Sequence, residues 1–318
     1  MRKWIVGAIV LVFAGVIFWF FLGSGDSGSA PSSSFLSSFS KEQVYLFTSF
    51  RDNGDGLHIA YSEDGLKWTD LNRTFLRPDV GGKLMRDPFI LQGPDGVFHL
   101  VWTSGWYDKG IGYASSQDLI NWSQQRLIPV MQETPGTKNC WAPEIFYDGL
   151  KKEYLITWAS DVDESASETE AKRVTNNDIY YAVTKDFVTF SQAQPFYAAT
   201  FNVIDANIIE HSGRYIMAFK GQGGIQLAGA FNVRGPYGLL APMAIIGGTE
   251  LVGPGFAKIG DEYILYYMGN GGKTCRASKT LDFDNWTDIT SQIQAVSGQT
   301  QGSIIKVGKS IADRLMGD

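Results

Sequence analysis

The chain has 318 residues, of which 44% are hydrophobic and 14% aromatic, and its formal net charge is −6. This composition is sufficient for a substantial packed core, so we expect a globular protein. The acidic balance, without long runs of one sign, argues against nucleic acid as a partner. With two cysteines and three histidines, the fold cannot depend on a disulfide framework. The histidines also lack zinc-ligand spacing, so we expect no metal site of that kind.

The N-terminus predicts a membrane anchor. Arg2 and Lys3 precede an uncharged run of 19 residues, 4–22, which as a helix would span ~29 Å, close to the ~30 Å core of a bilayer. With the basic residues inside, residues 1–3 form a short cytoplasmic end of a single-pass membrane protein, and the rest of the chain is extracytoplasmic. The run ends in aromatic residues, which favours an uncleaved signal-anchor. A cleaved signal peptide followed by secretion stays the alternative.

The composition changes twice after this apolar run. Residues 23–42 are rich in glycine and serine, which predicts a flexible linker. From Val44 onward, short runs rich in Tyr, Phe, Trp, Ile and Val alternate with turns that contain Gly, Asp and Asn. This pattern is typical of an all-β fold.

An internal repeat organises the all-β part of the chain. A phrase that ends in an aromatic residue recurs after most pairs of expected strands. Its copies are Ser62–Trp68, Ser116–Trp122, Thr184–Phe190, a weaker copy that ends at Tyr237, and Ser278–Trp286, which carries two extra residues. The aromatic positions are separated by 54, 68, 47 and 49 residues. We expect Asp or Asn in each phrase to make a turn, and the aromatic to pack between neighbouring sheets.

Five copies at this interval predict a five-bladed β-propeller over residues 43–308, preceded by one N-terminal transmembrane helix and followed by a C-terminal tail, 309–318. A propeller must close its ring or leave sheet edges unpaired. The late run 303–307 is the candidate strand to complete the first blade, which begins at 44–47. No second domain is needed.

Carboxylates recur at the expected entries of the innermost strands. The phrases are Met85–Ile90, Cys140–Ile145, Asn202–Asn207 and Glu250–Pro254. A charge in such an apolar setting is costly unless it is solvated, paired or used. For any one phrase alone, a turn cap or an ion pair with Arg86 is the simpler interpretation, but recurrence in successive blades favours a shared site. Converging carboxylates are what glycoside hydrolysis needs, because one protonates the leaving oxygen and another activates water.

At these phrases the sequence resembles the five-bladed glycoside hydrolases of family 43, and the resemblance covers nearly all of residues 44–307. It is most similar to the branch of α-L-arabinofuranosidase-type proteins. The motifs that carry the resemblance are Met85-Arg86-Asp87-Pro88, Asn139-Cys140-Trp141-Ala142-Pro143-Glu144 and Phe201-Asn202-Val203-Ile204-Asp205-Ala206. The stretches 92–96 and 110–116 are also similar.

The resemblance implies a role for each residue of these motifs. Asp87 would be the general base, and Asp205 the carboxylate that orients the general acid and tunes its pKa. Glu144, with Trp141, would lie in or beside the sugar pocket. Arg86 and Asn207 are the other candidate substrate-binding residues. Family members of this type invert configuration, with the carboxyl groups of acid and base ~6.5–9.5 Å apart.

Two positions depart from the family pattern. Where the family has Glu-Gly-Pro, with glutamate as general acid, this chain has Val252-Gly253-Pro254, and valine cannot donate a proton. Glu250 is the candidate replacement acid, although a two-residue shift along a strand moves Cα by about 6.5–7 Å. Gln301 stands where the family often has a histidine that helps to hold a metal ion. No cofactor is required, and a central calcium ion, which the resemblance allows, is put in doubt by Gln301.

Three functions compete on this evidence. The leading hypothesis is inverting hydrolysis of O-glycosidic bonds in pentose-containing glycans, α-L-arabinofuranosides first, with an oligosaccharide or polysaccharide as substrate. The second is a membrane-displayed carbohydrate-binding pseudoenzyme, which Val252 and Gln301 favour. The third is a scaffold for protein partners, which would need an apolar or aromatic patch on the outer face. The lipid bilayer is a partner through the N-terminal helix in each case.

Overall fold

The computed structural model describes residues 43–51, 54–163, 176–240, 246–248 and 250–317, all of which belong to one compact unit. The anchor predicted at 4–22 and the linker predicted at 23–42 lie outside the described residues. Within the described ranges, no helix is both long and apolar enough to cross a bilayer.

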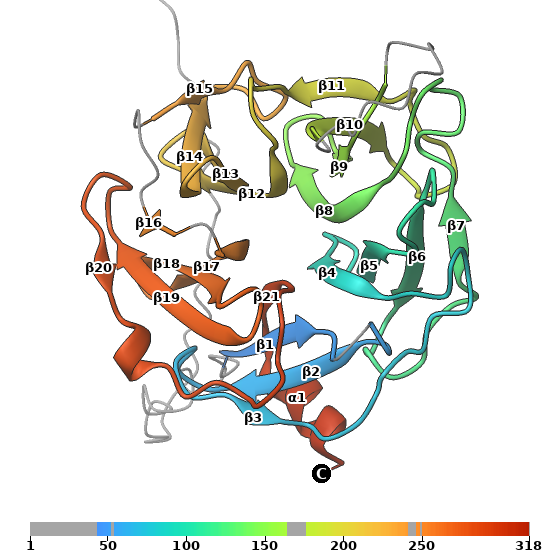
Figure 1. Ribbon diagram of the computed structural model, residues 1–318. Coiled ribbons are helices and arrows are strands. Elements are labelled where there is room, and N and C mark those ends of the chain that lie inside the picture. Colours follow the sequence, from blue (N-terminus) through green and yellow to red (C-terminus); the bar gives the residue numbers. More distant parts are fainter. Residues whose placement is uncertain (1–42, 52–53, 164–175, 241–245, 249, 318) are drawn as a thin grey trace, which may run out of the picture. The chain divides into compact units, whose positions relative to one another are not determined.

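The strands form five antiparallel sheets, which are the blades of a propeller (Figure 1). The first blade contains β21 (Ile304–Gly308), β1 (Gln43–Ser49), β2 (His58–Ser62) and β3 (Thr69–Asp70). The second contains β4 (Arg86–Gln92), β5 (Phe98–Thr103), β6 (Ile111–Ser116) and β7 (Arg126–Ile128). The third contains β8 (Trp141–Asp148), β9 (Glu153–Ser160), β10 (Asp178–Thr184) and β11 (Gln194–Tyr197).

The fourth blade contains β12 (Ile204–His211), β13 (Arg214–Gly221), β14 (Gly224–Ala230), β15 (Gly238–Leu239) and β16 (Ile246–Gly247). The fifth contains β17 (Val252–Ile259), β18 (Glu262–Gly269), β19 (Thr274–Thr280) and β20 (Thr287–Asp288), and is followed by a short 3-10 helix, η3 (Thr290–Gln292). The innermost strands contact one another in the order β21, β4, β8, β12, β17 and back to β21, so the ring is closed. The five-bladed propeller predicted from the repeat is therefore confirmed.

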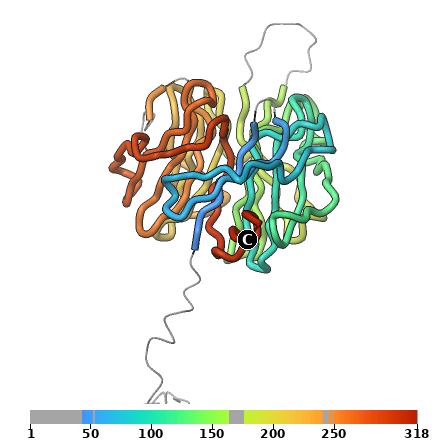
Figure 2. The backbone as a smooth tube through the Cα atoms, turned by 90° about the horizontal axis from the view of Figure 1, so that it is seen from below, coloured from blue at the N-terminus to red at the C-terminus, as the bar shows by residue number. Residues whose placement is uncertain are grey.

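Closure of the ring follows the predicted pairing. The last strand, β21, pairs antiparallel with β1, in a register that runs from Gln43 opposite Gly308 to Phe47 opposite Ile304. The backbone N–H of Thr48 extends this ladder by donating to the carbonyl oxygen of Ser303 over 2.9 Å. Figure 2 shows the two ends of the propeller in this shared blade, β1 in blue and β21 in red. A strand from the C-terminal end thus covers the edge that β1 would otherwise expose.

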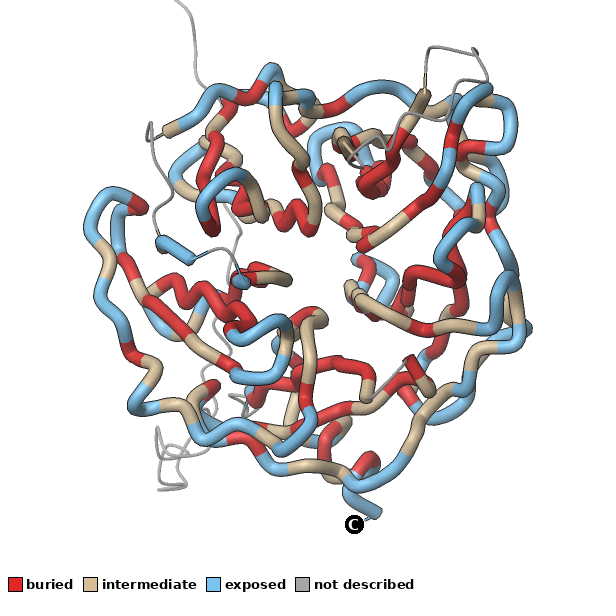
Figure 3. The backbone as a smooth tube through the Cα atoms, viewed as in Figure 1, coloured by how far each residue is buried: buried red, intermediate tan, exposed pale blue. Residues whose placement is uncertain are grey.

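The hydrophobic core is divided among the five junctions between blades. Each of five buried clusters draws its side chains mainly from two neighbouring sheets. Figure 3 shows the result, with buried segments along the strands and exposed segments around the outer rim. The predicted role of the repeat aromatic is seen at Trp68, whose ring lies 6.0 Å from that of Tyr266 in the fifth blade.

The repeat phrases make the predicted turns, and they also bury a residue that the sequence pattern did not single out. The Asp118 carboxylate accepts the backbone N–H groups of residues 120 and 121 over 2.9 and 2.7 Å. The residue after the aspartate is buried at φ between 54° and 64° in three copies, Leu119, Phe187 and Phe283. Phe187 reaches into the second blade, where its ring stacks on His99 at 4.0 Å. This residue packs between blades as the terminal aromatic was expected to do.

Two boundaries differ from the sequence prediction. The last repeat begins at Thr280 rather than Ser278, because the hydroxyl of Thr280 bonds Asp282 and the Phe283 N–H as its counterparts do, so this copy carries no extra residues. The expected tail, 309–318, contains a helix, α1 (Lys309–Met316). Its buried Ala312 and Leu315 join the core cluster between the first two blades. A helix of eight residues without a side-chain cap carries too weak a sequence signal to predict.

Candidate active site

Four innermost strands begin with the same backbone irregularity. In β4, β8, β12 and β17 the register with the next strand slips between the first strand residue and the fourth. The second residue of each has a positive φ: 52° at Asp87, 46° at Ala142, 58° at Asp205 and 59° at Gly253. A β-bulge of this kind bends the strand and re-aims the side chains at its entry. The four entries are therefore structurally equivalent positions.

The first residue of each bulged strand lines one common cavity. These residues are Arg86, Trp141, Ile204 and Val252. The cavity has a volume of about 520 Å³, within the range of small-molecule sites. Asp87 and Asp205 line it as well, together with Trp106, Lys273 and Gln301 from loops around the mouth. Arg86 and Val252 are 166 positions apart in the chain, and their side chains meet at one end of the ring.

Asp87 is held from two sides. The hydroxyl of Thr103 donates to Asp87 Oδ2 over 2.8 Å, and the side-chain amide of Gln301 donates to Oδ1. Thr103 is itself fixed, since its Oγ1 accepts the backbone N–H of Ala142 over 2.8 Å. Burial raises the pKa of Asp87, and the nearby Arg86 guanidinium opposes that rise. The carboxylate is therefore oriented and surrounded by donors while its proton affinity exceeds that of a solvated aspartate.

Asp205 is bonded to a backbone donor of the next blade. Its Oδ2 accepts the N–H of Gly253 over 2.9 Å, which ties the entry of β12 to the entry of β17. Burial, followed by the negative charge of Asp87, raises the pKa of Asp205 to about 6. Only 5% of Asp205 is exposed. Two carboxyl groups that share one site in this way do not ionise independently.

Glu144 and Asn207 lie deeper in the channel. A narrow hollow of about 20 Å³ is lined by Asp87, Glu144 and Asp205 together. The Asn207 amide donates to Glu144 Oε2 over 2.8 Å and accepts the N–H of Phe256 over 2.8 Å. Burial raises the pKa of Glu144 well above its ordinary value, the charges of Asp205 and Asp87 add to the rise, and the Asn207 amide opposes it. Glu144 therefore holds a proton to higher pH than a surface glutamate does.

Aromatic side chains form one wall of the cavity mouth. The indole N–H of Trp141 donates to the Trp106 carbonyl oxygen over 3.0 Å, and the two rings meet edge-on at 6.0 Å. Trp106 is 49% exposed and Tyr107, next to it, is 85% exposed. The Arg86 guanidinium lies 4.6 Å from the centre of the Phe50 ring and 5.1 Å from that of Trp106. Exposed aromatic faces beside buried polar groups suit a ligand that is apolar on one face and polar at its edges.

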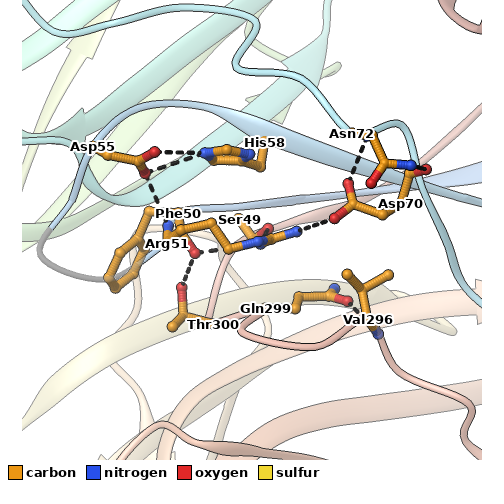
Figure 4. A network of polar contacts seen from close by, with 10 residues as sticks. All are labelled: Ser49, Phe50, Arg51, Asp55, His58, Asp70, Asn72, Val296, Gln299 and Thr300. Atoms are coloured by element: carbon orange, nitrogen blue, oxygen red, sulfur yellow. Dashed lines mark hydrogen bonds and ion pairs between the residues drawn. The ribbon is translucent and has the colours of Figure 1, made fainter.

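The opposite wall is a loop, 298–301, that a polar network fixes to the first blade (Figure 4). Thr300 Oγ1 donates to the Phe50 carbonyl oxygen over 2.7 Å. The Arg51 guanidinium donates to Ser49 Oγ over 2.6 Å and pairs with Asp70 over 3.3 Å. The Thr300 contact therefore ties the loop, next to Gln301, to a first-blade segment that the Arg51 contacts hold in place.

The structure brings most of the predicted site residues together and leaves one outside. Asp87, Asp205, Glu144, Arg86, Trp141 and Asn207 all line the connected hollows of the channel. The convergence predicted for the three carboxylates is confirmed, whereas their roles in a reaction stay predictions. Glu250 is exposed and lines a separate surface hollow with Asn270 and Arg276. It lies outside the cavity because Val252, two residues later, is the entry residue that faces the cavity.

Comparison with known proteins agrees with this geometry. The profile of a family described as "Probable glycosyl hydrolase domain", in the group related to glycoside hydrolase family 43, matches residues 41–313. The chain belongs to this family. As a member it is a glycosidase-type domain, and the match spans the whole propeller described above.

Similarity to individual proteins carries less weight for activity than the family match. An α-L-arabinofuranosidase of Bifidobacterium longum subsp. longum is 26% identical over 168 residues, which cover 46% of this chain and 16% of that protein. The chain thus matches only a small part of that relative. A thermostable family-43 glycoside hydrolase superposes with a TM-score of 0.52 at 17% identity, covering 68% of this chain and 78% of the other. A family 62 α-L-arabinofuranosidase catalytic domain of Coprinopsis cinerea gives 0.52 at 13% identity, covering 72% and 76%. At such identities these structures show the shared fold.

Three residues of this glycosidase-type domain were not predicted as site residues. Thr103 ends a fully buried strand, Trp106 follows it in a loop, and Lys273 lies in the turn between β18 and β19. Each contributes from outside the innermost strands, so the strand-entry pattern could not find it. The exposed aromatic run at 106–107 was the one available signal, since such residues on a loop often mark binding surfaces.

Among the described residues no group of three or more His, Cys, Asp or Glu side chains is placed to hold a metal ion. Gln301, which the sequence resemblance aligns with a histidine, directs an amide donor at Asp87 and helps to hold its carboxylate.

Proposed function

We propose that this domain is an inverting, exo-acting glycosidase that hydrolyses pentose-containing glycans, with α-L-arabinofuranosides as the first candidates. The observation that carries the proposal is the meeting of Asp87 and Asp205 in one cavity whose rim is formed by Trp106 and Trp141. The arabinofuranosidase relative supports the choice of sugar. The family membership supports hydrolysis of a glycosidic bond.

Asp87 is the group that activates water in this proposal. Its two oxygens accept bonds from Thr103 and Gln301, so the carboxylate cannot rotate freely. A general base needs a pKa close enough to the working pH to take a proton, and burial raises the pKa of Asp87 in that direction. Water held by Asp87 would attack the anomeric carbon from the face opposite the leaving group.

Among the described residues, none with a carboxyl group lines the cavity beside Val252 in the position of a general acid. Val252 stands at the β17 entry and lines the cavity, and it has no proton to give. Glu250 lines a different hollow, so it does not replace the acid. Loss of a general acid commonly costs ~10²–10⁴-fold in rate. Glycosides with acidic leaving groups should therefore react far better than those with alkyl or sugar leaving groups.

Asp205 would act on the β17 entry rather than on water. It accepts the N–H of Gly253 and is almost fully buried. In an enzyme with a glutamate at position 252, this contact would orient the acid. In this chain the contact between Asp205 and the Gly253 N–H holds the backbone next to Val252, so Asp205 is a positioning residue.

The test is hydrolysis of 4-nitrophenyl α-L-arabinofuranoside by the full-length chain, with proton NMR of the first sugar formed. We expect release of the β-anomer and loss of activity in Asp87→Asn. The matched control is Asp79→Asn, which changes an exposed carboxylate in the loop before β4 and should leave the rate unchanged. Retention of the α-anomer, or full activity of Asp87→Asn, would contradict the proposal.

One observation favours a second function, a carbohydrate-binding protein without turnover. Val252 removes the acid while the aromatic wall and the buried polar groups stay in place. Calorimetric binding of an arabino-oligosaccharide that survives Asp87→Asn, together with no hydrolysis of the aryl glycoside, would establish this function in place of catalysis.

We also propose that the domain is displayed on the extracytoplasmic side of a membrane. The support is the apolar run 4–22 behind two basic residues, which lies outside the described residues. Retention in the membrane fraction after alkaline carbonate extraction, and loss of that retention when residues 1–22 are removed, would support it. A soluble mature chain that begins after residue 22 would show cleavage and secretion instead.

A further inference from the structure

Two cationic side chains line the same cavity as Val252. They are Arg86 and Lys273. In the ion pairs between described residues the cationic partners are other side chains, so neither Arg86 nor Lys273 belongs to one of these pairs. The Arg86 guanidinium lies over the faces of the Phe50 and Trp106 rings, and its charge also acts on the Asp87 and Asp205 carboxyl groups. Such stacking leaves the in-plane N–H donors of the guanidinium available for an anion.

Lys273 is held near the position where the acid is missing. It closes the turn after β18, where its N–H donates to the Gly269 carbonyl oxygen over 3.0 Å. In the same turn the N–H of Gly271 donates to the Glu250 carbonyl oxygen over 3.1 Å. The turn is therefore bonded to the backbone two residues before Val252. Lys273 itself is exposed, so its side chain is solvated and reaches the cavity from the rim.

Two cationic side chains beside Val252 favour a particular kind of leaving group. A leaving oxygen must either receive a proton or depart as a stable anion. Val252 supplies no proton, whereas Arg86 and Lys273 supply positive charge. Positive groups aimed at developing negative charge stabilise a transition state without any proton transfer. An arginine fork with a lysine point charge is a common arrangement for phosphate oxygens.

We propose that the substrate is a glycosyl phosphate or a similar glycosyl ester of an acidic oxyanion, whose departing anion is bound by Lys273 and Arg86. The inference rests on the proposed function, because it uses the same cavity and the same base. Asp87 takes a proton from water, the water oxygen forms the new bond to the anomeric carbon, and the bond from that carbon to the phosphate oxygen breaks. The electron pair of that bond leaves with the phosphate, and the proton on Asp87 returns to solvent.

The test compares two substrates of the full-length chain that share a sugar, below about pH 6, where the phosphate ester is a monoanion that departs as hydrogen phosphate and the two leaving groups therefore have similar acidity. They are α-L-arabinofuranosyl 1-phosphate and 4-nitrophenyl α-L-arabinofuranoside. Charge-assisted contacts to phosphate should raise kcat/KM for the phosphate about tenfold or more over the aryl glycoside. Lys273→Met should lower kcat/KM for the phosphate about tenfold more than for the aryl glycoside, because phosphate presents several charged oxygens to the lysine and the phenolate presents one.

The matched control is Lys258→Met, since Lys258 is exposed on the same blade and lies near the other end of β17. We expect it to change neither rate. If the aryl glycoside is hydrolysed but the phosphate is not preferred, or if Lys273→Met affects both substrates equally, the inference is wrong and the proposed function stands. If neither substrate is hydrolysed, both are wrong. Inorganic phosphate should also inhibit the wild type more strongly than it inhibits Lys273→Met.

Discussion

The entries of β4 and β17 have the same backbone conformation but carry side chains of different chemistry. Both begin with a bulge, both have a second residue at positive φ, and both have proline third. At β4 the second residue is Asp87, whose carboxylate is held by Thr103 and Gln301. At β17 it is Gly253, and the residue before it is Val252. The repeated fold therefore sets where a side chain can act, and the side chain alone decides whether it does.

The comparison also separates the two halves of a hydrolytic site. The side that would activate water has a carboxylate, two donors and a raised pKa. The side that would protonate the leaving group has Val252 at its entry, which carries no acidic proton, and a backbone contact to Asp205. Four predictions test this difference, beginning with the largest effect.

Removal of the carboxylate at the β4 entry should have the largest consequence. Asp87→Asn keeps the shape of the side chain but cannot accept a proton from water, so kcat/KM should fall by ~10²–10⁴-fold on every substrate. Circular dichroism should show an unchanged fold. A loss confined to alkyl glycosides would mean that Asp87 acts on the leaving group instead.

A carboxylic acid restored at the β17 entry should make the two sides alike. Val252→Glu places a proton donor at a position that already lines the cavity, and kcat/KM for an alkyl arabinofuranoside should rise by ~10–10²-fold. Val252→Gln is the isosteric control without an acidic proton. Glu250→Gln should have no effect, because Glu250 lines another hollow. A large loss in Glu250→Gln would show that the acid comes from there.

The positive φ shared by the strand entries can be tested through the free energy of unfolding. A Cβ at Gly253 would lie 2.2 Å from Gln301 Cβ, at φ +59°. Gly253→Ala should therefore lower the free energy of unfolding by ~1–3 kcal/mol, and should also disturb the Gln301 contact to Asp87. Ala142→Gly, at the equivalent entry with φ 46°, should change it by less than ~1 kcal/mol. Denaturant unfolding measures the free energy of unfolding of the two variants. Equal changes in both would show that the clash at Gly253 does not occur.

The smallest expected effect concerns proton binding. The pKa of Asp205 is about 6 in the folded protein, against ~3.9 for an unfolded aspartate. Between these values the folded state binds more protons, so this group's contribution to stability falls as pH rises from about 4 to 6 and is largest below that window. Asp87→Asn removes a negative charge and should lower the pKa of Asp205. Carbon-13 NMR titration of the aspartate carboxyls measures this shift, and an unchanged pKa would show that the two groups do not interact.

The sequence was sufficient to predict the ring and the meeting of the carboxylates. Repeats spaced about fifty residues apart predict blades, and equivalent positions in successive blades must face the same channel, so Asp87 and Asp205 were expected to converge. The closing strand was also predictable, because the unpaired run 303–307 had one open edge to fill. These conclusions depend on periodicity, which one sequence displays directly.

Contacts made by loops could not be predicted from the repeat. Gln301 was noticed only as a departure from a family pattern, and its bond to Asp87 spans 214 positions in the chain. Nothing in the turn that holds Lys273 indicates that it folds toward Val252, since no repeat fixes its direction. Glu250 lies outside the cavity for a related reason: it stands in a turn before β17, so the strand alternation assumed from the sequence does not apply to it.

The most direct test of the central claim, a site with a base and no acid, is the dependence of rate on leaving-group acidity. For a series of aryl α-L-arabinofuranosides, log kcat/KM should fall steeply as the pKa of the departing phenol rises, because the oxygen departs without a proton. Val252→Glu should flatten this dependence. A steep slope for the wild type and a shallow one for Val252→Glu is the predicted result. A shallow slope for the wild type would contradict the account, because it would show that some other residue already protonates the leaving group.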